Sequence, residues 1–143
     1  MNVDQILSLK GRNVVSIDAS QSLGDAARLL SERRIGAVVV LDGRQPVAGI
    51  LSERDIVKAV ATQGARALDE PVSRFMTTEV ITCTGRSSVN ELMELMTQRK
   101  FRHVPVVEGG QITGIISIGD VVKQRVEEVE AESRAIKDYI ATA

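Results

Sequence analysis

The chain contains two copies of one sequence unit, and this repeat limits the folds open to it more than any other feature. Residues 14–43 align with residues 80–109, and after a one-residue deletion residues 47–58 align with residues 112–123. A unit of roughly 60 residues buries only about 60% of its unfolded surface, so a single copy would be marginally stable. We therefore predict that the two copies pack sheet to sheet about a pseudo-twofold axis.

Each copy has the pattern β-α-β-β-α, which predicts a mixed α/β (α+β) fold with two facing sheets and the helices outside. A short strand leads to Ser22 or Ser88, each followed three residues later by an acid, as in a capping box at a helix start. Two apolar strands separated by a glycine turn follow, and Ser52 or Ser117 begins the second helix. The predicted strands are residues 14–17, 37–41 and 47–51 in the first copy and 80–83, 103–107 and 112–117 in the second.

Domain boundaries follow from the same pattern. The predicted parts are the first repeat (1–61), a polar linker (62–70), the second repeat (71–127) and a C-terminal helical extension (128–143). Val3, Ile6 and Leu7 predict a short N-terminal helix with a partial echo in residues 72–76. We expect this helix to complete the first repeat.

The last helix is predicted to run from Ser117 to about Thr142. Apolar residues recur along it at heptad spacing, with one interruption at Ser133. They are Val122, Val126, Val129, Ile136 and Ile140. A tail helix packed on its own domain would explain the same pattern. The length of the helix and the charged residues beside the apolar positions favour a surface for a partner.

Composition excludes several classes of function. The 18 Lys and Arg residues balance the 19 Asp and Glu residues, and only 2% of the residues are aromatic, so no nucleic-acid partner is expected. The apolar runs are far shorter than the ~20 residues of a membrane helix, and residues 1–10 lack the layout of a signal peptide. We therefore expect a cytoplasmic protein without a membrane partner.

The chain has 1 Cys and 1 His, which excludes a Cys/His zinc site, a disulfide within the chain and a CxxC centre. Cys83 is interpreted as a core residue, and His103 as a packed or rim residue, with a phosphate contact as the alternative. The sequence has neither a G-x-x-x-x-G-K-[ST] loop nor a nucleophile with an adjacent base. We therefore expect no metal, no cofactor and no catalytic activity.

The two copies are most similar in a strand-to-helix segment that contains Ser-x-x-Asp. Ser52 and Ser117 are predicted N-caps, and the N–H groups of the following turn form a corner that favours anions. The acids three residues on, Asp55 and Asp120, could accept two hydrogen bonds from a vicinal diol such as ribose. A helix cap without a ligand is the alternative, because Ser-x-x-Asp is also an ordinary helix start.

The Ser-started helix, the h-P-V-like strand and the closing G-h-h-[ST]-x-x-D-h motif, each in two copies, resemble a tandem CBS domain pair, also called a Bateman module. The resemblance extends from about Val3 to Glu127. It implies a stand-alone sensor of the bacterial type that binds adenosine-containing compounds in two clefts between the repeats. The implied ligands are AMP, ADP, ATP, NAD or S-adenosylmethionine. CBS pairs also commonly dimerise, so together with the helical pattern we expect a homodimer.

The resemblance also implies roles for individual residues. Asp55 and Asp120 correspond to the ribose-binding acids, with the hydroxyls of Ser52 and Ser117 beside them. The other nucleotide-binding candidates are the hydroxyl pair Ser16 and Thr82, the strand residues Ala37 and His103, and the adenine walls Ile35, Phe101, Val38 and Val104.

We expect the two clefts to differ, because the first copy offers residues 35–37 and Arg54, whereas the second offers residues 101–103 and Gly119. Arg54 and Arg102 are the preferred phosphate ligands, since a chain with a net charge of -1 must supply cations locally. For Lys100, a solvated helix face explains the residue at least as well.

The sequence therefore predicts a regulatory module that binds an adenosine-containing nucleotide between its repeats and signals to an unknown partner protein through a shift in shape or affinity. A ligand-independent interaction and dimerisation module is the alternative, in which the Ser-x-x-Asp segments serve only as helix caps. Ligand binding by variants of Asp55 and Asp120 separates the two hypotheses.

Overall fold

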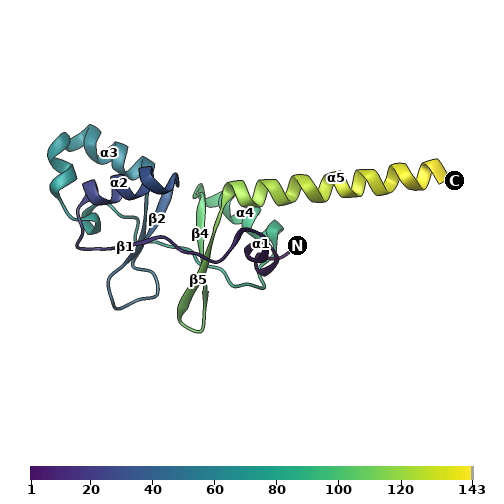
Figure 1. Ribbon diagram of the computed structural model, residues 1–143, viewed down its shortest axis with the longest axis horizontal. Helices are drawn as coiled ribbons and strands as arrows, with labels where there is room; N and C mark the ends of the chain where they lie inside the picture. The colour runs from purple at the N-terminus through teal and green to yellow at the C-terminus, as the bar shows by residue number, and fades with distance from the viewer. Residues whose placement is uncertain (143) are drawn as a thin grey trace.

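The computed structural model describes residues 1–142, and its helices and strands follow the predicted order (Figure 1). The first half contains α1 (Val3–Lys10), β1 (Ser16–Asp18), α2 (Leu23–Arg33), β2 (Ala37–Leu41), β3 (Gly49–Ser52) and α3 (Glu53–Gln63). Two 3-10 helices, η1 (Ala65–Asp69) and η2 (Val72–Arg74), precede the second half. The second half contains α4 (Val89–Arg99), β4 (His103–Glu108), β5 (Gln111–Ser117) and α5 (Ile118–Thr142).

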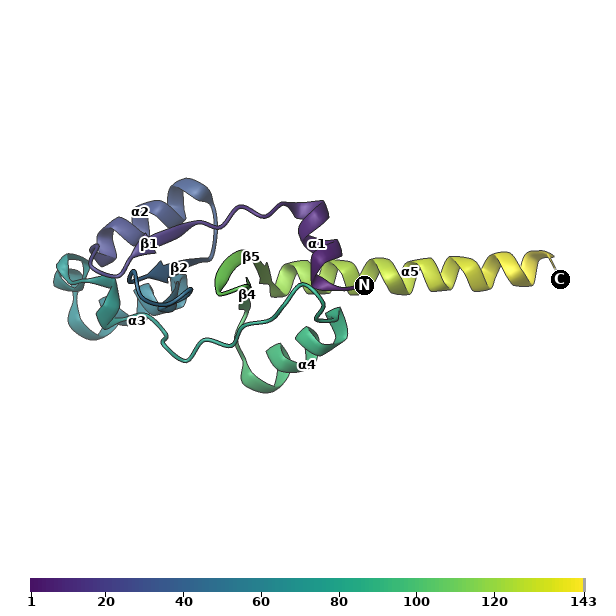
Figure 2. The ribbon, with the colours of Figure 1, turned by 90° about the horizontal axis from the view of Figure 1, so that it is seen from below.

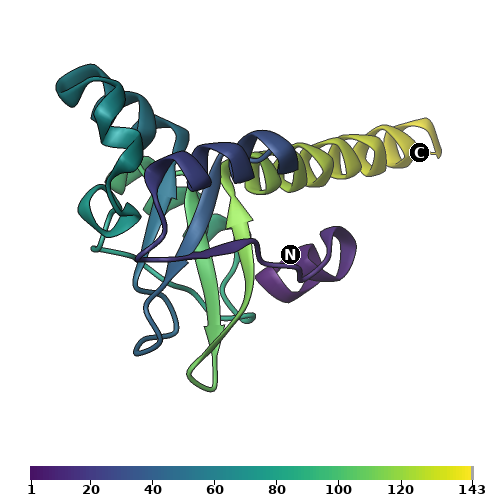
Figure 3. The ribbon, with the colours of Figure 1, turned by 60° about the vertical axis from the view of Figure 1, so that its left-hand side comes forward.

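The two sheets stand side by side in the middle of the molecule (Figures 1 and 3). Helices α2 and α3 lie beyond the first sheet, whereas α4 and α1 lie beyond the second (Figure 1). This arrangement confirms the mixed α/β fold of two facing repeats. Helix α5 begins at the second sheet and then projects far from the rest of the chain.

The first sheet has the strand order β1-β2-β3. β1 runs parallel to β2, with Ser16 opposite Val39, and β2 runs antiparallel to β3, with Val38 opposite Leu51. Helix α2 provides the crossover that a parallel pair of strands requires. Its start is the predicted one, because Ser22 Oγ accepts a hydrogen bond from the N–H of Asp25 at 3.1 Å.

The second sheet contains only β4 and β5, which differs from the prediction of a strand at residues 80–83. That segment forms a single parallel bridge, in which the N–H of Cys83 donates to the carbonyl of Pro105 at 3.0 Å. Extension of the ladder would need an N–H from residue 105 to the carbonyl of Ile81, and proline has none. In the first repeat Val39, which aligns with Pro105, donates this bond to the carbonyl of Val15 at 3.2 Å.

Each repeat has its own hydrophobic core, and α1 packs into the core of the second repeat rather than the first. Val3, Ile6 and Leu7 are buried in the cluster that contains Leu92 and Ile116. The expectation that this helix completes the first repeat is therefore wrong. Figure 2 shows α1 beside the start of α5, joined to β1 by an extended segment.

The segment predicted as a polar linker is folded and contributes a buried residue to the first core. Helix α3 continues to Gln63, and η1 buries Ala67 completely in the first core. Val72 of η2 is buried in the same core. The first repeat is therefore closed by residues that follow it in the chain, whereas the second repeat takes in the N-terminal helix.

Candidate functional site

Both predicted acids lie in the first turn of a helix that directly follows a strand. The N–H of Ser52 donates to Oδ2 of Asp55 at 2.9 Å, and the N–H of Asp55 donates to Oγ of Ser52 at 3.3 Å. The second copy has the same pair of bonds, from the N–H of Ser117 to Oδ2 of Asp120 at 2.9 Å and from the N–H of Asp120 to Oγ of Ser117 at 3.2 Å. Each acid is therefore fixed in place by its own capping box.

The first residue of α3 and of α5 also forms a backbone hydrogen bond to the residue just before β2 or β4 of its own repeat. The N–H of Glu53 donates to the carbonyl of Gly36 at 2.9 Å, and the N–H of Ile118 donates to the carbonyl of Arg102 at 2.8 Å. Together with the capping bonds, these contacts use two N–H groups of each first turn. Each helix N-terminus therefore has fewer free N–H groups for an anion than the sequence predicted.

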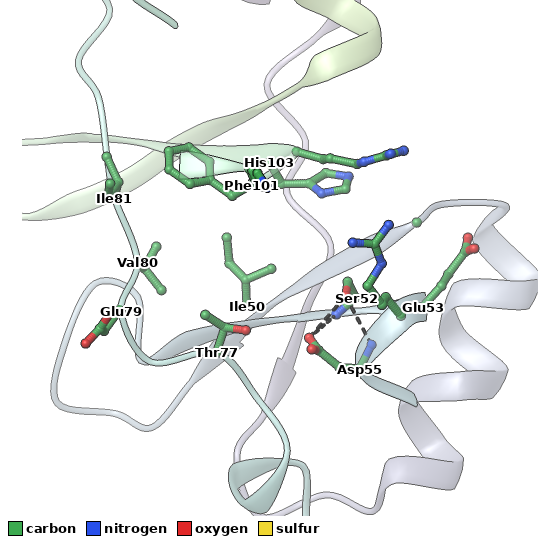
Figure 4. A pocket seen from close by; sticks show the side chains of 14 residues that line it. Ile50, Ser52, Glu53, Asp55, Thr77, Glu79, Val80, Ile81, Phe101 and His103 are labelled. Carbon is green, nitrogen blue, oxygen red and sulfur yellow. Dashed lines mark hydrogen bonds between the residues drawn. The ribbon is translucent and has the colours of Figure 1, made fainter. Parts of the chain in front are cut away.

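Two cavities lie between the repeats. The first, which we call cleft A, has a volume of about 380 Å³. It is lined by Gly36, Ile50, Ser52, Glu53, Arg54, Asp55, Thr77, Glu79, Val80, Ile81, Lys100, Phe101, Arg102 and His103. Figure 4 shows Asp55 and Thr77 on one side, Phe101 and His103 on the other, and Ile50 between them.

The second cavity, which we call cleft B, has a volume of about 420 Å³. It is lined by Lys10, Asn13, Val15, Ile35, Gly36, Ala37, His103, Ile115 and Ser117. Gly36 and His103 line both cavities, so the two clefts share one wall.

Each cleft combines residues from both repeats, as expected of clefts between the repeats. Cleft A joins Asp55 of the first repeat to residues 101–103 of the second, and cleft B joins Ser117 of the second repeat to residues 35–37 of the first. In cleft A the start of β4 lies across the cavity from the start of α3, as Figure 4 shows for His103 and Asp55. Arg54 of the first repeat and Arg102 of the second both line cleft A.

Five predicted residues are not among those that line either cavity: Ser16, Val38, Thr82, Val104 and Asp120. Asp120 lies beside cleft B, because its ion-pair partner Lys10 lines that cleft. Val38 and Val104 are fully buried in the two cores, because alternate residues of a strand point to opposite faces and these two face the helices. Their neighbours Ala37 and His103 face the clefts. Ser16 and Thr82 are exposed.

Sequence reasoning missed one wall of each cleft. In cleft A it is the segment at Thr77, whose N–H donates to the carbonyl of Ile50 at 2.9 Å and whose carbonyl accepts from the N–H of Ile50 at 3.0 Å. In cleft B it is the segment that carries Lys10, Asn13 and Val15. The repeat alignment pairs residues 10–15 with residues 76–81, so extending it to the N-terminus would have found both walls.

The two acids differ in their charge environment. Lys10 Nζ lies 2.7 Å from Oδ2 of Asp120 and also donates to the carbonyl of Ile115 at 2.9 Å. Within residues 1–142 Asp55 has no ion-pair partner, and its hydrogen bonds fall on Oδ2. Oδ1 of Asp55 is therefore available to a ligand.

The charged neighbours also shift the pKa values of Asp120 and His103. Burial acts to raise the pKa of Asp120, but the hydrogen bonds from Lys10 and Ser117 outweigh it, so the pKa is lowered. Burial, together with the positive charges of Lys10 and Arg102, lowers the pKa of His103, which keeps this imidazole neutral at pH 7.

Cys83 lies in the second core, as predicted, and burial raises the pKa of its thiol to about 11. The thiol is therefore not a reactive nucleophile near neutral pH. Across residues 1–142, no three His, Cys, Asp or Glu side chains are grouped to bind a metal ion.

The family is decided by comparison with known proteins. The profile of the CBS domain matches residues 6–62 and 72–127, which are the two repeats. The chain belongs to the CBS domain family. Small CBS pair proteins of this kind are generally regulatory modules without catalytic activity.

Similar proteins come from bacteria and plants. A CBS-domain containing protein of Agrobacterium tumefaciens, ATU1752, is 52% identical, with a TM-score of 0.84 over 87% of this chain and 99% of that one. The mitochondrial CBS protein CBSX3 of Arabidopsis thaliana is 36% identical over 81% of this chain and 58% of its own length. None of the helices in the described part of the CBS pair is long and apolar enough to cross a membrane.

Some related CBS proteins have known ligands or assemblies. The CBS domain pair of protein MJ0100, which is 24% identical with a TM-score of 0.76, was solved with 5'-methylthioadenosine and S-adenosylmethionine. It covers 87% of this chain, and the likeness shows the shared fold. A CBS-CP12 protein from cyanobacteria, 26% identical, is a hexamer.

Proposed function

We propose that this CBS pair is a cytoplasmic sensor that binds an adenosine-containing nucleotide in cleft A. The observation that carries the proposal is the carboxylate of Asp55, which faces the cavity without a cationic partner. A carboxylate in this state can accept hydrogen bonds from both hydroxyls of a ribose. The ligands of the CBS pair of MJ0100 contain the same sugar and support this class of ligand.

The remaining walls of cleft A suit the other parts of a nucleotide. Ile50, Val80 and Phe101 offer an apolar surface for the adenine ring. Arg54, Lys100 and Arg102 also line the cleft and can neutralise phosphate oxygens. AMP, ADP and ATP are therefore preferred over uncharged adenosine compounds, and NAD and S-adenosylmethionine are further candidates.

Cleft B is the weaker site in this proposal. The nearby acid, Asp120, is not among the residues that line the cleft and is already paired with Lys10, which does line it. A ribose therefore has to compete with an ammonium group that belongs to the chain. Binding there carries the cost of breaking this contact. We expect a nucleotide to occupy cleft A first.

Signalling follows from linkage between ligand binding and shape. A ligand in cleft A contacts both repeats, so it favours one relative orientation of the two. We propose that a homodimer of the CBS pair transmits this change to a regulated protein, which the chain does not identify.

Isothermal titration calorimetry with AMP, ADP, ATP, NAD, S-adenosylmethionine and GTP tests the proposal. Asp55→Asn keeps an oxygen for the cap but removes the charge, and we expect it to weaken adenine-nucleotide binding at least about tenfold. Glu91→Gln is the matched control, because Glu91 is the acid at the same position of the Ser88-capped helix α4 and lies outside both clefts. Equal binding by the wild type and Asp55→Asn would refute the assigned site.

A ligand-independent interaction module is the second candidate, and the exposed apolar residues of α5 favour it. Under this alternative none of the six compounds binds, although the protein still associates with itself. The same titrations therefore separate the two functions.

A further inference from the structure

Helix α5 projects from the rest of the chain (Figures 1 and 2). It carries an exposed apolar stripe along most of its length. The residues of this stripe are 47 to 67% exposed, although all are Val or Ile. They are Val122, Val126, Val129, Ile136 and Ile140. An apolar stripe of this length on a projecting helix indicates a surface that another helix covers.

The protein's own core takes a different face of α5. Val121 and Gln124 are buried against the second repeat, and the N-terminal ammonium of Met1 lies 3.2 Å from Glu128. These three positions are spaced by three and four residues and form one face, separate from the stripe. Packing of the tail on its own domain therefore does not account for the stripe.

Heptad positions follow from the stripe. Val126 and Ile140 take position a, Val122, Val129 and Ile136 take position d, and Ser133 fills the remaining a position. The flanking residues are Lys123, Glu130 and Lys137 at position e and Arg125, Glu132 and Tyr139 at position g.

The charges beside the stripe favour one orientation of a helix pair. In a parallel, in-register pair each g residue faces the e residue of the next heptad of the other helix. Arg125 then faces Glu130 of the partner subunit, and Glu132 faces Lys137 of the partner subunit, so both contacts are attractive.

An antiparallel pair of full overlap brings like charges together. There e faces e and g faces g, so Lys123 faces Lys137 of the partner subunit and Glu132 faces the partner's Glu132. Both contacts are repulsive. Full burial of the stripe is therefore compatible with the charges only in the parallel arrangement.

We propose that α5 pairs with α5 of a second copy of this chain as a parallel, in-register coiled coil. The match to the CBS family profile ends at residue 127, so much of this surface lies in an extension outside the family pattern. Alignment of Ser133 with its own copy fixes the register, since a polar a residue prefers a polar partner. The inference rests on the homodimer of the proposed function but not on nucleotide binding, which is measured separately.

Charge reversal in the full chain tests the orientation, with the dimer Kd measured by sedimentation over a concentration series. Glu132→Lys places like charges opposite each other, and we expect the Kd to rise about tenfold. Adding Lys137→Glu restores the opposite charges in a parallel pair and should return the Kd to near the wild-type value. In an antiparallel pair Glu132→Lys only exchanges one like-charge contact for another, and Lys137→Glu removes the repulsion from Lys123. A single variant that dimerises as tightly as the wild type, or a double variant that dimerises more tightly than the wild type, therefore overturns the proposal.

Disulfide cross-linking gives an independent readout. Ser133→Cys at position a should form a covalent dimer on mild oxidation, whereas Ala131→Cys at the outer f position should not. The wild type is a further control, because its Cys83 is buried. Each variant is checked for unchanged helical content and nucleotide binding. No cross-link through Ser133→Cys, or equal cross-linking of both variants, contradicts the parallel register, and a monomeric wild type contradicts the pairing itself.

Discussion

Lys10 Nζ lies 2.7 Å from Oδ2 of Asp120, although the two residues belong to opposite ends of the chain. Lys10 is the last residue of α1, and Asp120 lies in the first turn of α5. The contact exists because α1 packs into the second core and thereby brings its C-terminal end to cleft B. Cleft B therefore has a cation of the chain, Lys10, paired with the acid beside it, whereas Asp55 in cleft A has no ion-pair partner within residues 1–142.

Replacement of Lys10 by Met should turn cleft B into a second ligand site. The variant keeps the aliphatic part of the side chain but frees Asp120 for a ribose. With uncharged adenosine as the probe, we expect calorimetry to give about one site per chain in the wild type and about two in Lys10→Met, as the second acceptor becomes free. The loss of a partly exposed ion pair should cost no more than about 1 kcal/mol of stability.

Arg12→Met is the matched control for this experiment. Arg12 forms an ion pair with Asp4 at 3.3 Å in the same part of the chain but does not line either cleft. It should leave the number of sites unchanged. An unchanged number of sites in Lys10→Met as well would show that the contact does not control cleft B.

The free energy of unfolding should fall as the pH drops below 6.5. His103 has a pKa below its ordinary value of 6.5 in the folded protein, so in this range the unfolded chain binds more protons than the folded one. Asp120 acts at lower pH: its lowered pKa gives stability that is present above 3.8 and is lost as the pH falls through the folded value. Urea unfolding at pH 7.5, 5.5 and 3.5 measures both ranges.

The variant His103→Gln identifies the source of the first decrease. His103 is the single histidine of the chain, so the loss of stability between pH 7.5 and 5.5 should become smaller in this variant. The decrease at lower pH should persist. An identical profile in wild type and variant would assign the first decrease to other groups.

The contact between α1 and the second sheet predicts a specific effect at Gly114. A Cβ added there would lie 2.7 Å from Cδ2 of Leu7, and Leu7 is too deeply buried to move freely. Gly114→Ala should therefore destabilise the protein by about 1–3 kcal/mol in urea unfolding. In Gly119→Ala the nearest atom is 3.6 Å away, so the stability of this control should stay within ~1 kcal/mol of the wild type. Similar stability of the two variants would mean that α1 does not pack tightly.

Replacement of Pro105 should restore a strand at residues 80–83. Pro105→Val supplies the N–H that Val39 supplies in the first repeat, and this N–H can donate to the carbonyl of Ile81. We expect slower amide hydrogen exchange over residues 80–83, read by mass spectrometry, with no change at β1. Unchanged exchange would mean that the proline does not limit the strand.

The sequence predicts the repeat, the order of elements, the helix starts and the length of α5, because these depend on local patterns. Ser22 and Ser88 cap their helices as expected, and α5 continues to Thr142, the last residue that the structure describes. Of the candidate site, the acids and their capping serines were predictable, since both lie within one short motif.

Contacts between the repeats were not predictable in the same way. Two similar repeats offer nearly equivalent partners, so local pattern alone does not say whether α1 docks on the first core or the second. Nor does it say which cleft Arg102 joins. Val38 and Val104 were misjudged because the strand period places them on one of two faces, and only the packed sheets show which face lies toward the clefts.

The docking of α1 has a consequence for synthesis of the protein. Val3, Ile6 and Leu7 are synthesised long before Ile116 and Val121, which complete the core that buries them. Contacts of such long sequence separation form late and slow the folding of a domain. Until Ile116 and Val121 have been synthesised, the nascent chain therefore exposes the apolar face of α1, and a chaperone has a binding site during that interval.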